Sequence, residues 1–125
     1  MRDGPRRLAT DEQRDQLFTA RKRGGLCAAC GRALDEGEPV YFEHFVFRRV
    51  GPSTLTLQAP VGRECAAPET LAHAAGRDPE PCTGCGRGVF HRKARRGRQW
   101  VLCSRDCRNR AAAAARRAAR ERIGR

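Results

Sequence analysis

Seven cysteines carry the most specific chemical signal in this sequence of 125 residues. Four of them follow the spacing C-x2-C, 17 residues, C-x3-C: Cys82, Cys85, Cys103 and Cys107. Two thiolates from a knuckle and two from the first turn of a helix can surround one Zn²⁺ ion tetrahedrally. Because four thiolates leave no open coordination position, this spacing predicts a structural zinc ion and not a catalytic one.

The remaining cysteines predict a second zinc site that lacks one ligand. These are Cys27, Cys30 and Cys65. We favour His44, in a predicted strand, as the fourth ligand, although it could equally be an ordinary strand residue. His73 lies about 12 Å from Cys65 along a continuous helix, and Glu64 and Glu69 are poorer partners for three thiolates. The sequence therefore predicts two bound Zn²⁺ ions.

The setting of the cysteines favours metal over disulfides. The N-terminal MRDGPRRLATDEQ has no apolar core of a signal peptide, and no later segment is long enough to span a membrane. We therefore expect a cytoplasmic protein, in a compartment where thiols persist and paired CxxC motifs hold metal. The odd number of cysteines also fits a disulfide framework poorly.

The net charge of +12 is concentrated at one end of the chain. Residues 1–86 hold 12 Lys and Arg against 12 Asp and Glu, whereas residues 87–125 hold 14 basic residues against Asp106 and Glu121. Thirteen of these 14 are Arg, whose planar guanidinium suits phosphate. Such a segregated basic segment predicts a polyanion as partner, with a solubilising tail as the alternative.

The first half of the chain must position the site with three cysteines. In an N-terminal arm at residues 1–25, we expect disorder over residues 1–9 and a helix over residues 10–23, capped by Thr10 with Gln13 as reciprocal partner. Residues 26–76 are predicted to form a first zinc module. Its knuckle is followed by strands at 40–49 and 54–58 and a helix at 66–75.

The second half repeats this plan after a linker at residues 77–81. In residues 82–125 a second knuckle precedes strands at 89–91 and 99–102 and a helix from 104 to 123. The predicted fold is a small metal-bound α+β structure. It consists of two tandem treble-clef-like zinc modules, each a knuckle, a β-hairpin and a helix, with an N-terminal helix and a long basic C-terminal helix.

The order of motifs in residues 82–110 resembles the CGNR-type zinc finger. The shared features are the CxxC knuckle, a basic hairpin ending near Trp100, a Cys-Ser pair, and Cys-Arg-Asn-Arg before an Arg-rich helix. Arg108 stands where that family has Gly, and the last two cysteines are closer together. The same residues resemble FCS-type fingers and, more distantly, the zinc hairpin of DNA glycosylases. The resemblance implies a treble-clef-like zinc module of bacterial proteins thought to act in transcription.

The basic helix and the hairpin tip supply the predicted phosphate contacts. On a helical wheel most of the helix's Arg residues share one broad arc and its Ala residues share the other. The predicted nucleic-acid-binding residues are Arg92, Lys93, Arg95, Arg96, Arg98, Arg105, Arg108, Arg110, Arg116, Arg117 and Arg120. Trp100 and Phe90 are expected to fill the hairpin core, which favours duplex DNA or structured RNA over single strands.

Two functions follow from these patterns. The first is a zinc protein that binds DNA or RNA, as a transcription or ribosome-associated factor. The alternative is an adaptor whose first module binds a protein partner through aromatic residues, while the basic end docks on an acidic protein or RNA surface. Those aromatic residues are Tyr41, Phe42, Phe45 and Phe47. No acid–base constellation is visible, so we expect no enzyme activity, small-molecule substrate or membrane partner.

Overall fold

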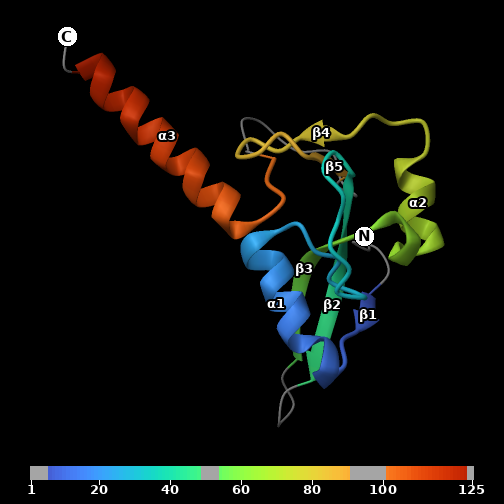
Figure 1. Cartoon of the computed structure of the whole chain (residues 1–125). Helices are drawn as coiled ribbons and strands as arrows, with labels where there is room; N and C mark the ends of the chain where they lie inside the picture. The colour runs from blue at the N-terminus through green and yellow to red at the C-terminus, as the bar shows by residue number, and fades with distance from the viewer. Residues whose placement is uncertain (1–5, 49–53, 91–100, 124–125) are drawn as a thin grey trace.

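The computed structural model describes residues 6–48, 54–90 and 101–123, and Figure 1 shows their arrangement. The regular elements, in chain order, are β1 (Arg6–Leu8), a 3₁₀ turn (Asp11–Gln13), α1 (Arg14–Arg23), β2 (Val40–Arg48), β3 (Thr54–Val61), a second 3₁₀ turn (Arg63–Cys65), α2 (Pro68–Ala74), β4 (Glu80–Pro81), β5 (Gly88–Phe90) and α3 (Arg105–Ile123). The predicted α+β class is therefore confirmed. None of the described helices combines the length and apolar character needed to cross a membrane.

Strand β2 is the centre of a mixed five-stranded sheet. It pairs with β3 in antiparallel fashion along almost its whole length, as the sequence predicts for a hairpin. Along its other edge it pairs in parallel with β1 and with β5, and β4 extends the sheet beyond β5. Val46, for example, lies opposite Thr56 of β3 and Leu8 of β1. The two halves of the sequence thus share one sheet.

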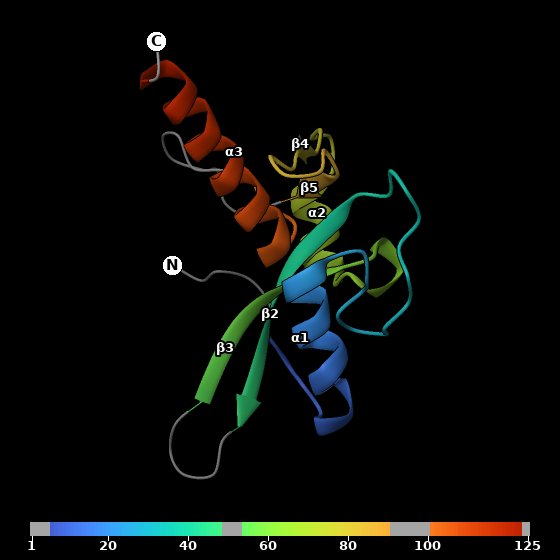
Figure 2. The ribbon, with the colours of Figure 1, turned by 60° about the vertical axis from the view of Figure 1, so that its left-hand side comes forward.

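Helix α1 lies against the β2–β3 hairpin, as Figures 1 and 2 show. Leu17 and Ala20 of α1 are fully buried, and Phe18 stacks on Phe47 of β2 with ring centroids 5.9 Å apart. Phe45 is the largest fully buried side chain of the core. The core is small, as the shortage of large apolar residues in the sequence implies, and four of its buried side chains are cysteines.

The N-terminal helix begins and ends where its capping residues predict. The Gln13 backbone N–H donates to Thr10 Oγ1 at 3.2 Å, and the Thr10 N–H donates to Gln13 Oε1 at 3.1 Å. This reciprocal capping box fixes the first turn, which is 3₁₀ in form. Gly24, with a φ of 72°, ends the helix.

The expectation of disorder over residues 1–9 is wrong for the part that the structure describes. Residues 6–8 form β1, and the N–H of the buried Ala9 donates to Val46 O at 2.9 Å. A three-residue strand carries no periodicity that a sequence could show, and its formation depends on the open edge of β2. Residues 1–5 lie outside the described residues.

The second half of the chain differs from the predicted hairpin. Its first strand is present as β5, but Val101 and Leu102 belong to no strand, and residues 91–100 lie outside the described part of the chain. The partners of β5 are instead β4, within the predicted linker, and β2. The first half follows its prediction more closely, since α2 covers most of the helix expected at 66–75 and β3 continues to Val61.

Candidate metal centres and basic surface

The four thiols predicted to share a metal ion do come together. Their Sγ atoms all lie within 4.8 Å of one another, and we call this group the four-cysteine cluster: Cys82, Cys85, Cys103 and Cys107. The sulfur of Cys103 lies 3.5 Å from that of Cys85 and 3.6 Å from that of Cys107. A tetrahedral zinc site with Zn–S bonds of about 2.3 Å places its sulfurs about 3.8 Å apart. All four cysteines are free thiols, so the arrangement fits a metal ion.

A tight contact between the knuckle and α3 builds the four-cysteine cluster. A Cβ atom on Gly84 would lie 2.6 Å from Cys107 Cβ and 2.7 Å from Cys107 O, so only glycine fits between the two ligand-bearing segments. Ser104 caps the helix, since the Cys107 N–H donates to Ser104 Oγ at 3.2 Å. Cys103 and Cys107 therefore hold the first turn of α3 against the knuckle.

Backbone N–H groups prepare one sulfur of the four-cysteine cluster to carry negative charge. Burial alone would raise the pKa of Cys82, but N–H donors from Cys103, Cys85 and Gly84 outweigh it and lower that pKa to about 7. Burial and the neighbouring thiols instead raise the pKa of Cys103. Cys82 is thus more easily deprotonated than Cys103, and the charge of a bound cation would favour deprotonation of the cluster.

The second group of thiols is also assembled, and we call it the three-cysteine cluster: Cys27, Cys30 and Cys65. The knuckle turns at Gly31, whose φ is 79°, and Cys65 is supplied by the 3₁₀ turn after β3. Burial would raise the pKa of Cys27, but N–H donors from Gly62, Cys30 and Ala29 lower it overall. Burial and the adjacent thiols raise the pKa of Cys65 to about 12.

The structure does not bring His44 to the three-cysteine cluster. Within the described residues this group comprises three thiols, and His44 is not among the side chains within 4.8 Å. His44 lies mid-strand, opposite Gln58 of β3. Successive strand residues point to opposite faces, and its neighbour Glu43 is the one that reaches the segment after Cys65. Spacing along the sequence cannot distinguish these two faces.

The other candidates for a fourth ligand are also placed elsewhere. His73 and Glu69 lie exposed on α2, beyond the turn that carries Cys65. Glu64 accepts from Arg32 Nε at 2.6 Å, and the same guanidinium donates to Glu38 at 2.6 Å. The exposed Arg32–Glu64 pair joins the knuckle to the 3₁₀ turn, and an exposed ion pair of this kind contributes little energy.

Glu43 and Arg7 form a buried support beside the three-cysteine cluster that the sequence analysis missed. Glu43 is 3% exposed, and its Oε2 accepts from the Ala67 N–H at 2.7 Å. Its Oε1 lies 2.6 Å from an Arg7 guanidinium nitrogen, as an ion pair without the alignment of a hydrogen bond. Arg7 also donates to Cys65 O at 2.6 Å. A glutamate within an aromatic strand, Tyr-Phe-Glu-His-Phe, is the signal that could have revealed this pair.

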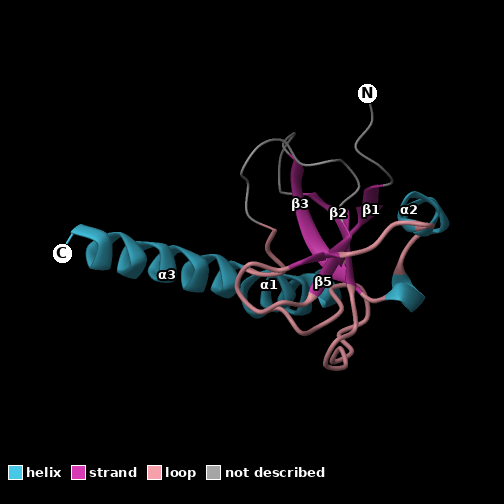
Figure 3. Cartoon of the chain, turned by 90° about the horizontal axis from the view of Figure 1, so that it is seen from above, coloured by secondary structure: helices cyan, strands magenta, loops and turns pink. Residues whose placement is uncertain are grey.

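Helix α3 presents the predicted basic surface. All of the predicted contact residues on this helix are exposed: Arg105, Arg108, Arg110, Arg116, Arg117 and Arg120. The buried residues of α3 are Cys107 and Ala111, and the helix extends away from the sheet beyond them, as Figures 1 and 3 show. The predicted contacts on the hairpin tip, which are Arg92, Lys93, Arg95, Arg96 and Arg98, lie outside the described residues.

The aromatic residues of the first half do not form the exposed patch that an adaptor would need. Tyr41 is 5% exposed and stacks on Phe90 with centroids 4.9 Å apart, and Phe45 is fully buried. Phe42 and Phe47 are half-buried. Tyr41 and Phe45 therefore serve the core, and the four residues form no wide exposed aromatic patch of the kind that would favour the adaptor hypothesis.

No family model, curated protein or solved structure matches this chain. The functional assignment therefore depends on the geometry described above.

Proposed function

We propose that this protein binds DNA or structured RNA through α3, and that Zn²⁺ in both cysteine clusters stabilises it. One observation carries the proposal: a solvent-exposed arginine helix whose start is bordered by two thiols of the four-cysteine cluster, Cys103 just before the helix and Cys107 in its first turn. A metal ion there would fix the direction in which the helix leaves the body of the protein. The metal's role is then structural, because four thiolates complete its coordination.

The two sides of α3 fit this role. Cys107 and Ala111 lie four residues apart and form its buried face. Arg116 and Arg120 fall on the opposite side of the helical wheel, and Arg117 lies at its flank. The helix has 19 residues and is about 28 Å long, so its arginines can follow several phosphates of a duplex.

Zinc is the metal that the ligand chemistry favours. Thiolates are soft ligands, and tetrahedral sites with four sulfurs are typical of zinc or iron–sulfur centres. Ligands supplied by a knuckle and by the first turn of a helix are also what the resemblance to CGNR-type, treble-clef-like fingers implies. That resemblance supports a role beside nucleic acid, in transcription or on the ribosome.

The test is the salt dependence of binding by the zinc-loaded full chain to duplex DNA and to a structured RNA. The variant Arg116→Gln/Arg117→Gln/Arg120→Gln should bind the preferred polymer more weakly. Its slope of log affinity against log salt should fall by about 2 to 3, because each lost phosphate contact removes roughly 0.9 from the slope for duplex DNA.

A matched control removes the same charge from another surface. Arg14, Arg23 and Arg63 are exposed residues outside α3, and their triple replacement by Gln should leave the slope nearly unchanged. If the two triple variants lose equal amounts of affinity and of salt slope, only the net charge of the protein attracts the polymer. In that case the assignment to α3 would be wrong.

A further inference from the structure

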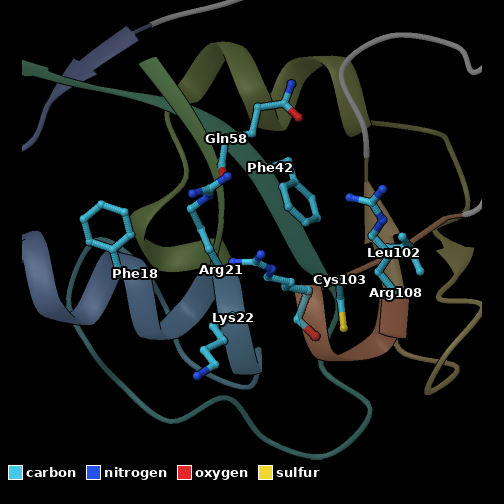
Figure 4. Close-up of a pocket in the computed structure, with 10 residues that line it drawn as sticks. Phe18, Arg21, Lys22, Phe42, Gln58, Leu102, Cys103 and Arg108 are labelled. Carbon is cyan, nitrogen blue, oxygen red and sulfur yellow. The ribbon is translucent and has the colours of Figure 1, made fainter. Parts of the chain in front are cut away.

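A basic cavity lies where α1, the β2–β3 hairpin and the start of α3 meet, and Figure 4 shows it. Its volume is about 620 Å³, within the range of small-ligand sites. The side chains that give it its chemical character are four cations and two aromatic rings: Arg21, Lys22, Arg105, Arg108, Phe18 and Phe42. The proposed contacts along the outer part of α3 do not use this cavity.

The charges around the cavity call for an anion. None of the lining residues in the described part of the chain carries a carboxylate. Arg21 is held in place by donating from Nε to Gln58 O at 3.0 Å. Lys22, Arg105 and Arg108 are exposed and form no ion pair with a described carboxylate. Like charges gathered at one opening repel one another, and an anionic ligand would relieve that repulsion.

Aromatic rings give the same cavity an apolar wall. Phe42 comes from β2 and lies, in Figure 4, between Arg21 of α1 and Arg108 of α3. Phe18 lies at the α1 side, where it stacks on Phe47. Aromatic faces beside guanidinium groups form a combination that holds an unpaired nucleotide, because the base stacks on the ring or guanidinium and the phosphate meets the cations.

The cavity is continuous with the proposed nucleic-acid surface. Arg105 and Arg108 belong both to its lining and to the first turn of α3. A strand that contacts the arginines along α3 would therefore reach this opening at the start of the helix. Cys103 also lines the cavity, so the four-cysteine cluster fixes this wall.

We infer that this cavity receives one unpaired nucleotide of the strand that α3 binds. The inference rests on the proposed function and makes it more specific. The preferred ligand is a duplex that carries a bulged or overhanging nucleotide, and not a fully paired one. The sequence favours duplex DNA or structured RNA over single strands because Trp100 and Phe90 are expected to fill a hairpin core, and spacing alone does not bring Phe18 and Phe42 beside the basic residues.

The test compares two DNA probes on the zinc-loaded full chain. One duplex carries a single unpaired thymidine, and the other is fully paired and one base pair longer, so that their charges are nearly equal. We expect the bulged probe to bind about tenfold more tightly, and we expect Phe42→Leu and Arg21→Gln each to abolish most of that preference. Arg23→Gln, on the same helix but outside the lining, should keep it.

Each outcome has a distinct meaning. Equal affinity for the two probes overturns the cavity assignment, while the proposed role of α3 stands as long as the paired duplex is bound. If only the structured RNA is bound, the same comparison is made with a bulged and a fully paired RNA duplex. Absence of binding to either polymer overturns the proposed function itself. If free thymidine monophosphate displaces the bulged probe with the same affinity as the probe itself, the cavity binds a free nucleotide and not one that belongs to a strand, which contradicts the inference. Zinc content and circular dichroism check that the Phe42→Leu variant folds. If that variant does not fold, Phe18→Leu, which replaces a more exposed ring, tests the same wall of the cavity.

Discussion

At the scale of single residues, the geometry of the four-cysteine cluster depends on Gly84. Because glycine has no Cβ atom, the knuckle can pack directly against Cys107. We expect Gly84→Ala to destabilise the fold by about 1 to 3 kcal/mol, because the new methyl group would meet backbone atoms that cannot rotate away. It should also weaken metal binding at the four-cysteine cluster. Urea unfolding and titration with Co²⁺ measure the two effects, and Thr83→Ala, at the exposed neighbouring residue, should change neither.

Glu43 is the second residue whose environment makes a clear prediction. Glu43→Gln removes a buried charge and leaves Arg7 beside Cys65 without its carboxylate. Because Arg7 keeps some contact with water, we expect a loss of stability at the lower end of the range for breaking a buried pair, about 3 kcal/mol in urea unfolding. Glu36→Gln, at an exposed turn, is the control. A loss no larger than that of the control would show that the pair contributes nothing.

At the scale of elements, the sequence predicted correctly those structures that are determined by short sequence motifs. The cysteine spacing, the Thr10 capping box and the β2–β3 hairpin depend on residues close in sequence, and each is present. Strand β1 and the parallel pairing of the correctly predicted strand β5 depend on the open edge of β2, which three residues of their own cannot reveal. Spacing likewise does not show which face of a strand meets a distant turn, and Glu43, next to His44, is the residue that reaches the segment after Cys65.

The start of α1 offers a test of one correctly predicted element. Thr10→Ala removes the oxygen that accepts from the Gln13 N–H, so we expect a loss of about 1 kcal/mol of stability. Thermal or urea unfolding measures it, with Thr54→Ala at an exposed strand end as the comparison. An unchanged stability would mean that tertiary contacts, such as the burial of Leu17, hold this turn without its cap.

At the scale of the whole molecule, one sheet connects the segments that carry the two cysteine clusters. Strand β5, which follows the knuckle of the four-cysteine cluster, pairs with β2, and Arg87 donates to the carbonyl oxygens of Asp35 at 3.0 Å and Glu38 at 2.7 Å. A Cβ atom on Gly24, at the end of α1, would lie 3.1 Å from Ser104 Cβ. A metal ion bound at one cluster would therefore help to order segments that the other cluster needs.

This connection predicts that the clusters bind metal cooperatively. We expect Cys107→Ser to lower the zinc affinity of the three-cysteine cluster by about 1 to 3 kcal/mol, and Cys65→Ser to lower that of the four-cysteine cluster by the same amount, because coupling between binding sites is reciprocal. Competition titrations with a chelator on the full chain measure both. Arg87→Gln, which leaves all thiols intact, should reduce the coupling. If each cluster instead binds zinc equally well when the other cluster is disrupted, the two sites have no coupling free energy. The halves of the chain then fold as separate modules despite the shared sheet.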